Sequence, residues 1–401
     1  MENKIKQAVI LAGGMGTRLK PFTDEHAKPM YRFNDKPFIE YLVEQVRDFG
    51  INQVLILLGY RAEEIMTYLC VGERFGRDVQ YIVTPMEYET GNRLCNAKKQ
   101  LEDRFLLMYC DNYCPIDFEK LVVDAFTNDA DVQISAYSNK DNYTKNNVYA
   151  DTDGKVIVYD KSRKCADLNC VDIGYAIVKK ELLELFSERE GIYNFEREVY
   201  GDCVLKGSLY ATVTEHRYYS IGSWERIELT KQFFSREKTI FIDRDGTINK
   251  RPPKAQYVQK PEDFIWLNRA EEGIALLKKK GYRVLLVSNQ PGIARGALTE
   301  KTLDEIHKKM QEDLRKDEGC EIDDLFVCPH NWDDGCDCRK PKPGMFYQAQ
   351  KKYSLNLHNC IMIGDDERDI EAGNAAGCTC FQVTDENSLF DIANKIVQGD
   401  M

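Results

Sequence analysis

The sequence predicts an α/β protein of two domains, and three observations support this class. Two short apolar strands, residues 8–11 and 239–242, each run directly into a polar loop that carries glycine. Behind each of them, amphipathic helical patterns alternate with further apolar strands. A short polar junction at residues 235–238 separates the two series, so we place the domains at residues 1–236 and 239–401.

The individual elements are predicted from hydrophobic periodicity and from turn residues. In the first domain we expect strands over 8–11, 53–58, 104–109, 133–137 and 155–159 and helices over 37–49 and 227–234. In the second we expect strands over 239–242, 282–287 and 359–363 and helices over 270–280 and 300–316. Open α/β sheets bind ligands at the carboxyl ends of their strands, so the loops after these strands are the candidate sites.

Composition restricts the classes of function. A hydrophobic content of 43% and a charged content of 30% are typical of a soluble globular protein. The net charge of −11 argues against a nucleic-acid partner, although a glycine-rich loop with one cation can still hold a nucleotide. The sequence contains neither an apolar run of membrane-spanning length nor a secretory signal pattern, so we expect no membrane partner and a cytoplasmic location. Its 14 cysteines are then free thiols or metal ligands.

Paired carboxylates follow the strand at residues 239–242. Asp243 and Asp245 stand at positions i and i+2 beyond the strand and can face one cavity. One can attack phosphorus, while the other protonates the leaving oxygen and later activates water, and a Mg²⁺ ion would lower the charge repulsion. Further groups for phosphate or metal follow later strands or lie in a loop between them: Ser288, Asn289, Arg339, Lys340 and Asp365.

Four soft ligands cluster between these groups. Cys328 and His330 form a CxH motif, and Cys336 and Cys338 form a CxC motif shortly after it. Three thiolates and one imidazole suit tetrahedral Zn²⁺. All four positions are filled by the protein, so a structural role is expected, in which the metal holds residues 339–340 near the phosphate.

These motifs resemble the haloacid dehalogenase superfamily. DRDGTIN, SNQPGIARG, CPH…GCDCRKPKPGM and GDDERD are similar to its zinc-bearing heptose-bisphosphate and histidinol-phosphate phosphatases, and more closely to the heptose-1,7-bisphosphate 7-phosphatases. The resemblance implies Asp243 as nucleophile, Asp245 as acid and base, and Mg²⁺ on Asp243, Asp245 and Asp365. It implies phosphate contacts from Ser288, Asn289, Arg339 and Lys340. One departure is Asp366, where the family often has lysine; Lys342 is either a replacement for it or a solvated loop residue.

A glycine-rich loop follows the strand at residues 8–11. Its sequence, LAGGMGTRL, lets the backbone N–H groups of Gly13, Gly14 and Gly16 approach phosphates, and Arg18 can meet a triphosphate. A dinucleotide-binding loop is the competing interpretation, but the GxGxxG spacing and its distal acid are both absent.

The first domain resembles the sugar-1-phosphate nucleotidyltransferases over residues 5–232. The shared pattern is GGxGTRL, then KPM at Lys28, then a strand-end aspartate, Asp111. The resemblance implies catalytic roles for Arg18 and Lys28, nucleotide contacts from the loop glycines, and Mg²⁺ on Asp111. A sugar phosphate would attack the α-phosphorus of an NTP and release pyrophosphate.

This domain also departs from its family. Ser220 stands where a second metal-binding aspartate is expected, and residues 89–93, ETGNR, replace a small-residue sugar loop. Lys161 and Asp172 are candidate sugar contacts. Asp172 could also supply the missing carboxylate, and the competing interpretation of both is that they are ordinary loop residues.

The sequence therefore predicts a bifunctional enzyme with two Rossmann-like domains, a nucleotidyltransferase fold with a mixed sheet and a haloacid dehalogenase-like fold with a zinc loop. The best substrate expectation, by resemblance, is heptose 1,7-bisphosphate leading to GDP-heptose, with Mg²⁺ in both sites. Two alternatives are kept: a cytidylyltransferase with a phosphatase for another sugar or polyol phosphate, and a phosphatase regulated by an inactive nucleotide-binding domain. A homo-oligomer is left open.

Overall fold

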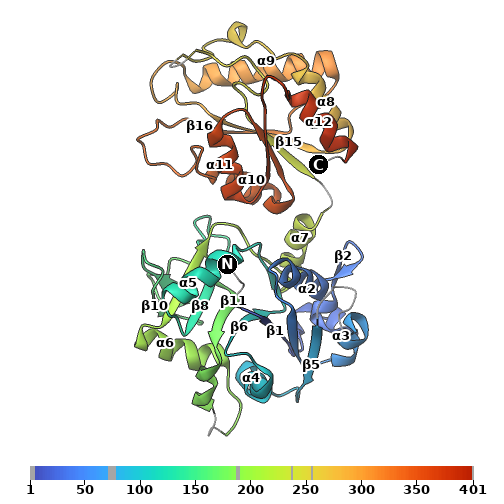
Figure 1. Cartoon of the computed structure of the whole chain (residues 1–401), viewed down its shortest axis with the longest axis vertical. Helices are drawn as coiled ribbons and strands as arrows, with labels where there is room; N and C mark the ends of the chain where they lie inside the picture. Colours follow the sequence, from blue (N-terminus) through green and yellow to red (C-terminus); the bar gives the residue numbers. More distant parts are fainter. Residues whose placement is uncertain (1–4, 71–77, 187–189, 236–237, 254–255, 400–401) are drawn as a thin grey trace. The chain divides into compact units, whose positions relative to one another are not determined.

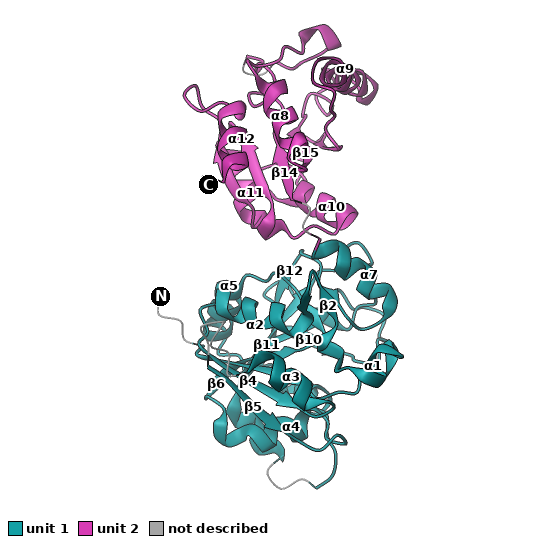
Figure 2. Cartoon of the chain, turned by 90° about the vertical axis from the view of Figure 1, so that its right-hand side faces the viewer, with its two compact units in different colours: residues 1–234 teal, residues 235–401 magenta. Residues whose placement is uncertain are grey.

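The computed structural model describes residues 5–70, 78–186, 190–235, 238–253 and 256–399. Contacts divide the chain into two compact units, Met1–Phe234 and Ser235–Met401 (Figure 2). The first holds a mixed sheet and the second a parallel sheet, so the predicted α/β class is confirmed. Among the described helices, none combines the length and the apolar composition that a membrane span requires.

The main sheet of the first unit has seven strands in the order β12-β8-β11-β6-β1-β4-β5. Figure 1 labels β8, β11, β6, β1 and β5. Strand β11 runs antiparallel to both its neighbours, and the other adjacent pairs are parallel. The strands are β1 (Gln7–Ala12), β4 (Gln53–Leu58), β5 (Asp78–Val83), β6 (Arg104–Tyr109), β8 (Val132–Tyr137), β11 (Val171–Lys179) and β12 (Leu209–Thr214). Short two-stranded ribbons are β2 (Arg32–Phe33) with β3 (Lys36–Pro37), β7 (Asn112–Tyr113) with β13 (Tyr219–Ser220), and β9 (Val148–Ala150) with β10 (Val156–Tyr159).

Hydrophobic clusters cover both faces of this sheet. Successive residues of β1 alternate between them, because side chains of a strand point to opposite faces: Ile10 belongs to one cluster and Leu11 to the other. The first cluster receives side chains from α2 (Phe38–Asp48), α3 (Ala62–Leu69), α5 (Phe118–Thr127) and α7 (Trp224–Phe233). The second receives them from α4 (Thr90–Ala97) and α6 (Gly201–Lys206), and the short helix α1 is Phe22–Glu25.

The second unit has a five-stranded parallel sheet in the order β16-β15-β14-β17-β18. Its strands are β14 (Thr239–Ile242), β15 (Arg283–Asn289), β16 (Asp324–Cys328), β17 (Ile361–Gly364) and β18 (Thr379–Gln382). The central β14 is wholly buried, as expected for a strand covered on both faces. One hydrophobic cluster joins the sheet to α8 (Ala270–Lys279), α9 (Glu300–Glu318) and α12 (Leu389–Gln398), and the other joins it to α10 (Gly344–Tyr353) and α11 (Glu367–Ala376).

Two helices of the second unit are fixed by their ends. The Thr299 side chain accepts a hydrogen bond from the Thr302 N–H at the start of α9, and Gly319, with φ of 68°, ends it. Asp366 begins α11 in a capping box with Asp369. The cap of α11 therefore places two carboxylates at the carboxyl edge of the sheet, directly after β17.

Candidate active sites

The carboxyl edge of the parallel sheet in the second unit carries a cleft of about 660 Å³. Asp243 follows β14, and Ser288 and Asn289 end β15; all three line the cleft together with Lys340 and Asp369. Polar groups from β14, β15, the loop before α10 and the start of α11 therefore meet in one place, as a parallel sheet requires.

Lys340 lies at the floor of this cleft and is only 2% exposed. Its Nζ is 2.6 Å from Asp243 Oδ1 and 2.6 Å from Asp369 Oδ1, and it donates to the Val287 carbonyl oxygen at 2.7 Å. These three partners use all three N–H bonds of the ammonium group. Burial raises the pKa of Asp243 to about 7, although the Lys340 charge opposes the shift.

Asp245 turns its carboxylate toward a different set of groups. It forms an ion pair with the guanidinium of Arg244 at 2.8 Å and accepts hydrogen bonds from Asn249 Nδ2 and Gln290 Nε2, each at 2.9 Å. Burial would raise the pKa of Asp245, but the Arg244 charge and these hydrogen bonds outweigh it and the pKa is lowered. The neighbours of Asp245 therefore fix its orientation and favour its charged form in the free protein.

Three carboxylates at this edge could hold a cation. Ligand oxygens of Asp243, Asp365 and Asp369 all lie within 4.8 Å of one another. Hard oxygen ligands of this kind suit Mg²⁺. The carboxylate of Asp245, which the resemblance implied as a Mg²⁺ ligand together with Asp243 and Asp365, is not part of this group. Asp369 was not predicted; its signal is an acid four residues after the strand-end Asp365, in the first turn of α11.

Gly246 allows Asp365 to approach Asp243. A Cβ atom at position 246 would lie 1.9 Å from Asp365 Oδ2, and the backbone there has a φ of +101°. Both facts require glycine, since L side chains rarely adopt this conformation. The glycine of the DRDG motif is thus needed for Asp365 to lie close to Asp243 and Asp369.

The remaining predicted residues of this cleft have specific partners. Asn289 uses both ends of its amide on the backbone of Lys340, donating to the carbonyl and accepting from the N–H, each at 3.0 Å. Arg339 donates to the His330 carbonyl at 3.3 Å. Lys342 donates to the carbonyl oxygens of residues 335 and 336 and is absent from the cleft lining. Asn289 therefore positions Lys340, while Lys342 belongs to the cysteine loop.

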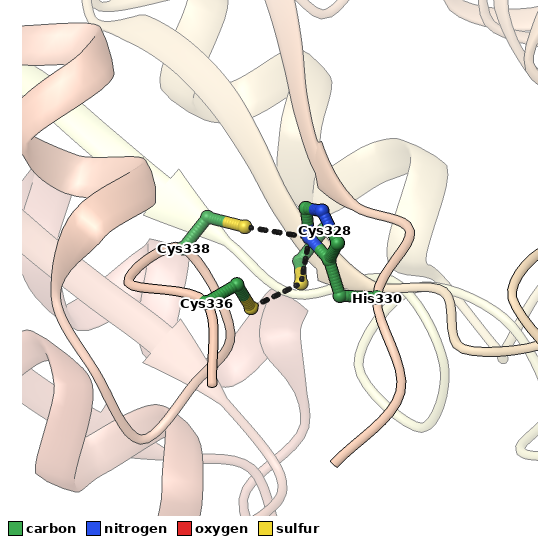
Figure 3. A group of neighbouring side chains, drawn as sticks. All are labelled: Cys328, His330, Cys336 and Cys338. Atoms are coloured by element: carbon green, nitrogen blue, oxygen red, sulfur yellow. Dashed lines mark hydrogen bonds between the residues drawn. The ribbon is translucent and has the colours of Figure 1, made fainter. Parts of the chain in front are cut away.

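The four predicted soft ligands converge (Figure 3). Cys328 Sγ lies 3.7 Å from Cys336 Sγ and 3.6 Å from His330 Nδ1, and that nitrogen lies 3.2 Å from Cys338 Sγ. A tetrahedral ion with Zn–S bonds of about 2.3 Å sets its sulfur atoms about 3.8 Å apart. The spacing of these side chains therefore fits a closed, four-coordinate zinc site.

A buried histidine on α9 lies beside the arginine that pairs with Asp245. Arg244 is fully buried, and its Nη1 lies 3.4 Å from His307 Nε2, an arrangement in which the imidazole is neutral and accepts. Burial and the Arg244 charge lower the pKa of His307 to about 3. Neither residue was identified from the sequence.

This histidine predicts a pH dependence of stability. The unfolded chain binds a proton at His307 with a pKa of about 6.5, whereas the folded chain does not, so stability is complete above that pH and falls as the pH drops toward 3. Between about pH 7.5 and about pH 5.5 the loss should be roughly 1.4 kcal/mol. Urea unfolding of the wild type and His307→Gln at both pH values measures it. An equal pH dependence in the two proteins would contradict the assignment.

The first unit carries a second cleft of about 430 Å³ at the carboxyl ends of β1 and β6. Six predicted residues line it together: Gly13, Gly14, Gly16, Arg18, Lys28 and Asp111. Lys28 Nζ forms an ion pair with Asp111 Oδ2 at 2.7 Å. The glycine-rich loop, the KPM segment and the strand-end aspartate are thus brought into one site.

Two other predicted residues are absent from the lining of this cleft. Asp172 accepts hydrogen bonds from the Tyr159 hydroxyl at 3.0 Å and from the Gly174 N–H at 2.8 Å. Burial raises its pKa to about 7, and the nearby charge of Glu196 adds to the shift. Lys161 forms an ion pair with Glu196. Asp172 and Lys161 therefore form a separate polar cluster with Glu196.

Ser220 lies next to Asp111. It pairs with Asn112 in the β7–β13 ribbon, and the following Ile221 N–H donates to the Asp111 carbonyl at 3.0 Å. The position expected for a second metal carboxylate is therefore present, but it offers only a hydroxyl. Within the described residues, Asp111 belongs to no cluster of three or more metal-binding side chains.

One residue of this cleft was not predicted. Arg93, on α4, lines the cleft although it is only 4% exposed. In the sequence, only the unusual segment at residues 89–93 drew attention to this position. The function of that segment could not be deduced without knowing the direction of the Arg93 side chain.

Comparison with known proteins assigns both units. The Nucleotidyl transferase family model matches residues 7–161, and the HAD-hydrolase-like model matches residues 337–396. Together with the two clefts, these matches define a bifunctional enzyme: a nucleotidyltransferase joined to a phosphatase of the HAD class. Both predicted activities are thereby confirmed.

Relatives narrow the class of the second unit. The chain is 41% identical over 155 residues to D-glycero-alpha-D-manno-heptose-1,7-bisphosphate 7-phosphatase of Photorhabdus laumondii, covering 36% of this chain and 82% of that protein. It is 39% identical over 156 residues to D-glycero-beta-D-manno-heptose-1,7-bisphosphate 7-phosphatase of Bordetella bronchiseptica, and this match covers 39% of this chain and 86% of that protein. Through its C-terminal unit the chain belongs to the D-glycero-D-manno-heptose-1,7-bisphosphate 7-phosphatase family.

A solved structure resembles the first unit. HddC from Yersinia pseudotuberculosis, complexed with GMP-PN, is 27% identical with a TM-score of 0.50. The match covers 57% of this chain and 99% of HddC.

Proposed function

We propose that the chain carries out two consecutive reactions on one sugar. The C-terminal unit removes the 7-phosphate of D-glycero-D-manno-heptose 1,7-bisphosphate, and the N-terminal unit then transfers a guanylyl group to the remaining 1-phosphate. This proposal rests on one observation: the same chain holds both the cleft lined by Asp243 and Lys340 and the cleft lined by Gly13 and Asp111. The activity named for the phosphatase relatives and the GMP-PN bound to HddC support the choice of sugar and base.

The phosphatase reaction assigns a role to each carboxylate of the DxD pair. An oxygen of Asp243 attacks the 7-phosphorus and the bond to the sugar oxygen breaks. Asp245, which takes up a proton when the anionic substrate binds beside it, gives that proton to the sugar oxygen. Water then attacks the phospho-aspartate, Asp245 takes its proton, and phosphate and the free carboxylate are formed. Arg244, Asn249 and Gln290 hold Asp245 in place for both steps.

Cations assist from the same edge. Arg339 and the Ser288 hydroxyl would meet the phosphoryl oxygens, while Lys340, which Asn289 keeps in position, would supply positive charge beside Asp243. Asp243, Asp365 and Asp369 would hold Mg²⁺, which supplies charge neutralisation between an anionic nucleophile and an anionic phosphate.

The cysteine loop is proposed to hold structural Zn²⁺ and thereby to fix Lys340. We expect Cys336→Ser to lower bound zinc below one per chain and to reduce phosphate release by at least about tenfold, because the loop before Lys340 loses a crosslink. Metal content and phosphate release are measured together, with Cys165→Ser, an exposed thiol of the other unit, as control. Full activity in a zinc-free Cys336→Ser protein would contradict the role.

The nucleotidyltransferase reaction proceeds by positioning. The sugar 1-phosphate oxygen attacks the α-phosphorus of the nucleotide and pyrophosphate leaves. Backbone N–H groups at Gly13, Gly14 and Gly16, with Arg18 and Lys28, would hold the triphosphate, and Asp111 would hold Mg²⁺. Lys161 and Asp172 remain candidate sugar contacts.

A panel of four NTPs against several sugar and polyol phosphates tests this function, with pyrophosphate release as the readout. We expect GTP with heptose 1-phosphate to react fastest, and phosphate release to be fastest with heptose 1,7-bisphosphate. Preference for CTP with a polyol phosphate would support the alternative enzyme, which the altered segment at residues 89–93 keeps open. The cytoplasmic location and the lack of a nucleic-acid partner stay predictions.

A further inference from the structure

Arg93 connects three adjacent strands at the edge that carries the nucleotide cleft. Its Nη1 donates to the Leu58 carbonyl at 2.8 Å and to the Thr84 hydroxyl, and its Nη2 donates to the Gly13 carbonyl at 3.2 Å. Leu58 ends β4, Thr84 follows β5, and Gly13 lies just beyond β1. The planar fork of the guanidinium reaches all three at once from two separate nitrogen atoms, whereas a lysine would have to donate from a single nitrogen.

The contact with the glycine-rich loop is unusually close. A Cβ atom at position 13 would lie 2.3 Å from Arg93 Cζ and 2.5 Å from its Nε. Gly13 is therefore required at this point by the arginine behind it, and the arginine occupies the space that a side chain would fill.

The hydrogen bond to Gly13 also orients the next peptide. In a trans peptide the N–H of residue 14 points opposite to the carbonyl of residue 13. That carbonyl accepts from Arg93 Nη2 and from the Tyr60 N–H at 3.2 Å. The Gly14 N–H therefore points away from both donors, and Gly14 lines the cleft.

The charge of Arg93 is not matched by a bonded carboxylate. All of its hydrogen-bond acceptors among the described residues are neutral: the carbonyls of Gly13, Leu58 and Met86 and the hydroxyl of Thr84. A buried cation without a bonded counter-ion is costly, and the charge of the exposed Glu87 acts on Arg93 without a hydrogen bond; an anion bound in the adjoining cleft offsets that cost. Donation from a charged group also polarises the peptide and strengthens its N–H as a donor.

We propose that Arg93 is a positioning residue for the phosphates of the nucleotide. It fixes the peptide between residues 13 and 14 so that the Gly14 N–H faces the cleft, and it places a buried positive charge behind that peptide. This inference rests on the nucleotidyltransferase function proposed for the cleft, and it identifies the polyphosphate rather than the base or the sugar as the part of the substrate that Arg93 serves.

The test compares Arg93→Met, which removes the charge at similar length, with Arg93→Lys, which keeps the charge and loses the fork. Arg104→Met is the matched control. Arg104 is a partly buried arginine of the same sheet, but it lies at the amino end of β6, whereas the cleft lies at the carboxyl ends of the strands. Pyrophosphate release gives the KM for NTP and for sugar phosphate. Inorganic tripolyphosphate serves as a base-free probe, with its Ki from inhibition and its Kd from titration calorimetry, which needs no turnover. Phosphate release by the other unit calibrates the amount of intact enzyme.

We expect Arg93→Met to raise the KM for NTP and the Ki for tripolyphosphate by the same factor, about tenfold, with the KM for sugar phosphate within twofold of wild type. Arg93→Lys should show the same pattern at about threefold, and it decides the question if Arg93→Met does not fold. Equal changes in both KM values would mean a general structural role and would overturn the proposal. So would an effect on NTP without one on tripolyphosphate, or no effect at all. If wild-type enzyme released no pyrophosphate with any NTP, the proposed function would fail, while calorimetry would still decide the role of Arg93.

Discussion

Replacement of Asp243 by asparagine should abolish phosphate release from the sugar bisphosphate and leave pyrophosphate release unchanged. An amide is not a nucleophile toward phosphorus, so the loss should exceed about 10³-fold. Asp369 remains as a charged partner of Lys340, at 2.6 Å, and should keep the buried ammonium paired. Both activities are measured on the same preparation, together with its thermal unfolding.

Asp385→Asn is a suitable control for this experiment, because it removes an exposed carboxylate of the same unit that does not line the cleft. It should retain both activities. If Asp243→Asn lowered pyrophosphate release in parallel with phosphate release, the two-site description of the chain would be wrong.

The second large effect is expected at Asp111. Asp111→Asn should reduce pyrophosphate release by roughly 10²–10³-fold without changing phosphate release. The reason is specific to this chain: Ser220 offers no second carboxylate beside Asp111, and among the described residues Asp111 belongs to no cluster of three or more metal-binding side chains. A steady-state assay over a range of Mg²⁺ concentrations measures both the rate and the Mg²⁺ needed for half-maximal activity.

Asp172→Asn is the informative comparison. Asp172 lies outside the cleft lining and is hydrogen-bonded to Tyr159, so its substitution should leave the Mg²⁺ requirement unchanged. A shift in that requirement equal to the shift in Asp111→Asn would mean that Asp172 replaces the missing carboxylate. Asp153→Asn, at an exposed turn, controls for the loss of a charge.

The regular elements that the sequence predicted are those with an uninterrupted apolar signal. The strands expected over 53–58, 104–109 and 239–242 coincide with β4, β6 and β14, which lie in the interior of their sheets and are largely buried. Strand β5, at the edge of its sheet, has a mostly exposed or half-buried pattern and was not predicted. Strand β17 begins at Ile361, two residues later than expected, because Leu357–Asn359 form a 3₁₀ turn. The antiparallel direction of β11 depends on long-range pairing, which no local pattern records.

The sequence also predicted only part of the two sites. The sequence placed Asp243, Lys340 and the four soft ligands in separate motifs, and the structure brings Asp243 and Lys340 together across 97 positions. The sequence did not reveal the residues that hold other site residues in place. Arg244 could have been an exposed residue between two aspartates, and only the burial of its side chain against His307 identifies its role. Asn289 was predicted to bind phosphate, yet its amide is used on the backbone of Lys340. Support of this kind depends on side-chain direction, which short motifs do not specify.

The close approach of Arg93 to Gly13 also makes the two positions depend on each other. A side chain at residue 13 would collide with the guanidinium where it now lies, so glycine in the loop and arginine on α4 restrict each other. In related chains an arginine at this helix position should therefore occur only with glycine in the loop, whereas chains with a small residue there are free to vary the loop position.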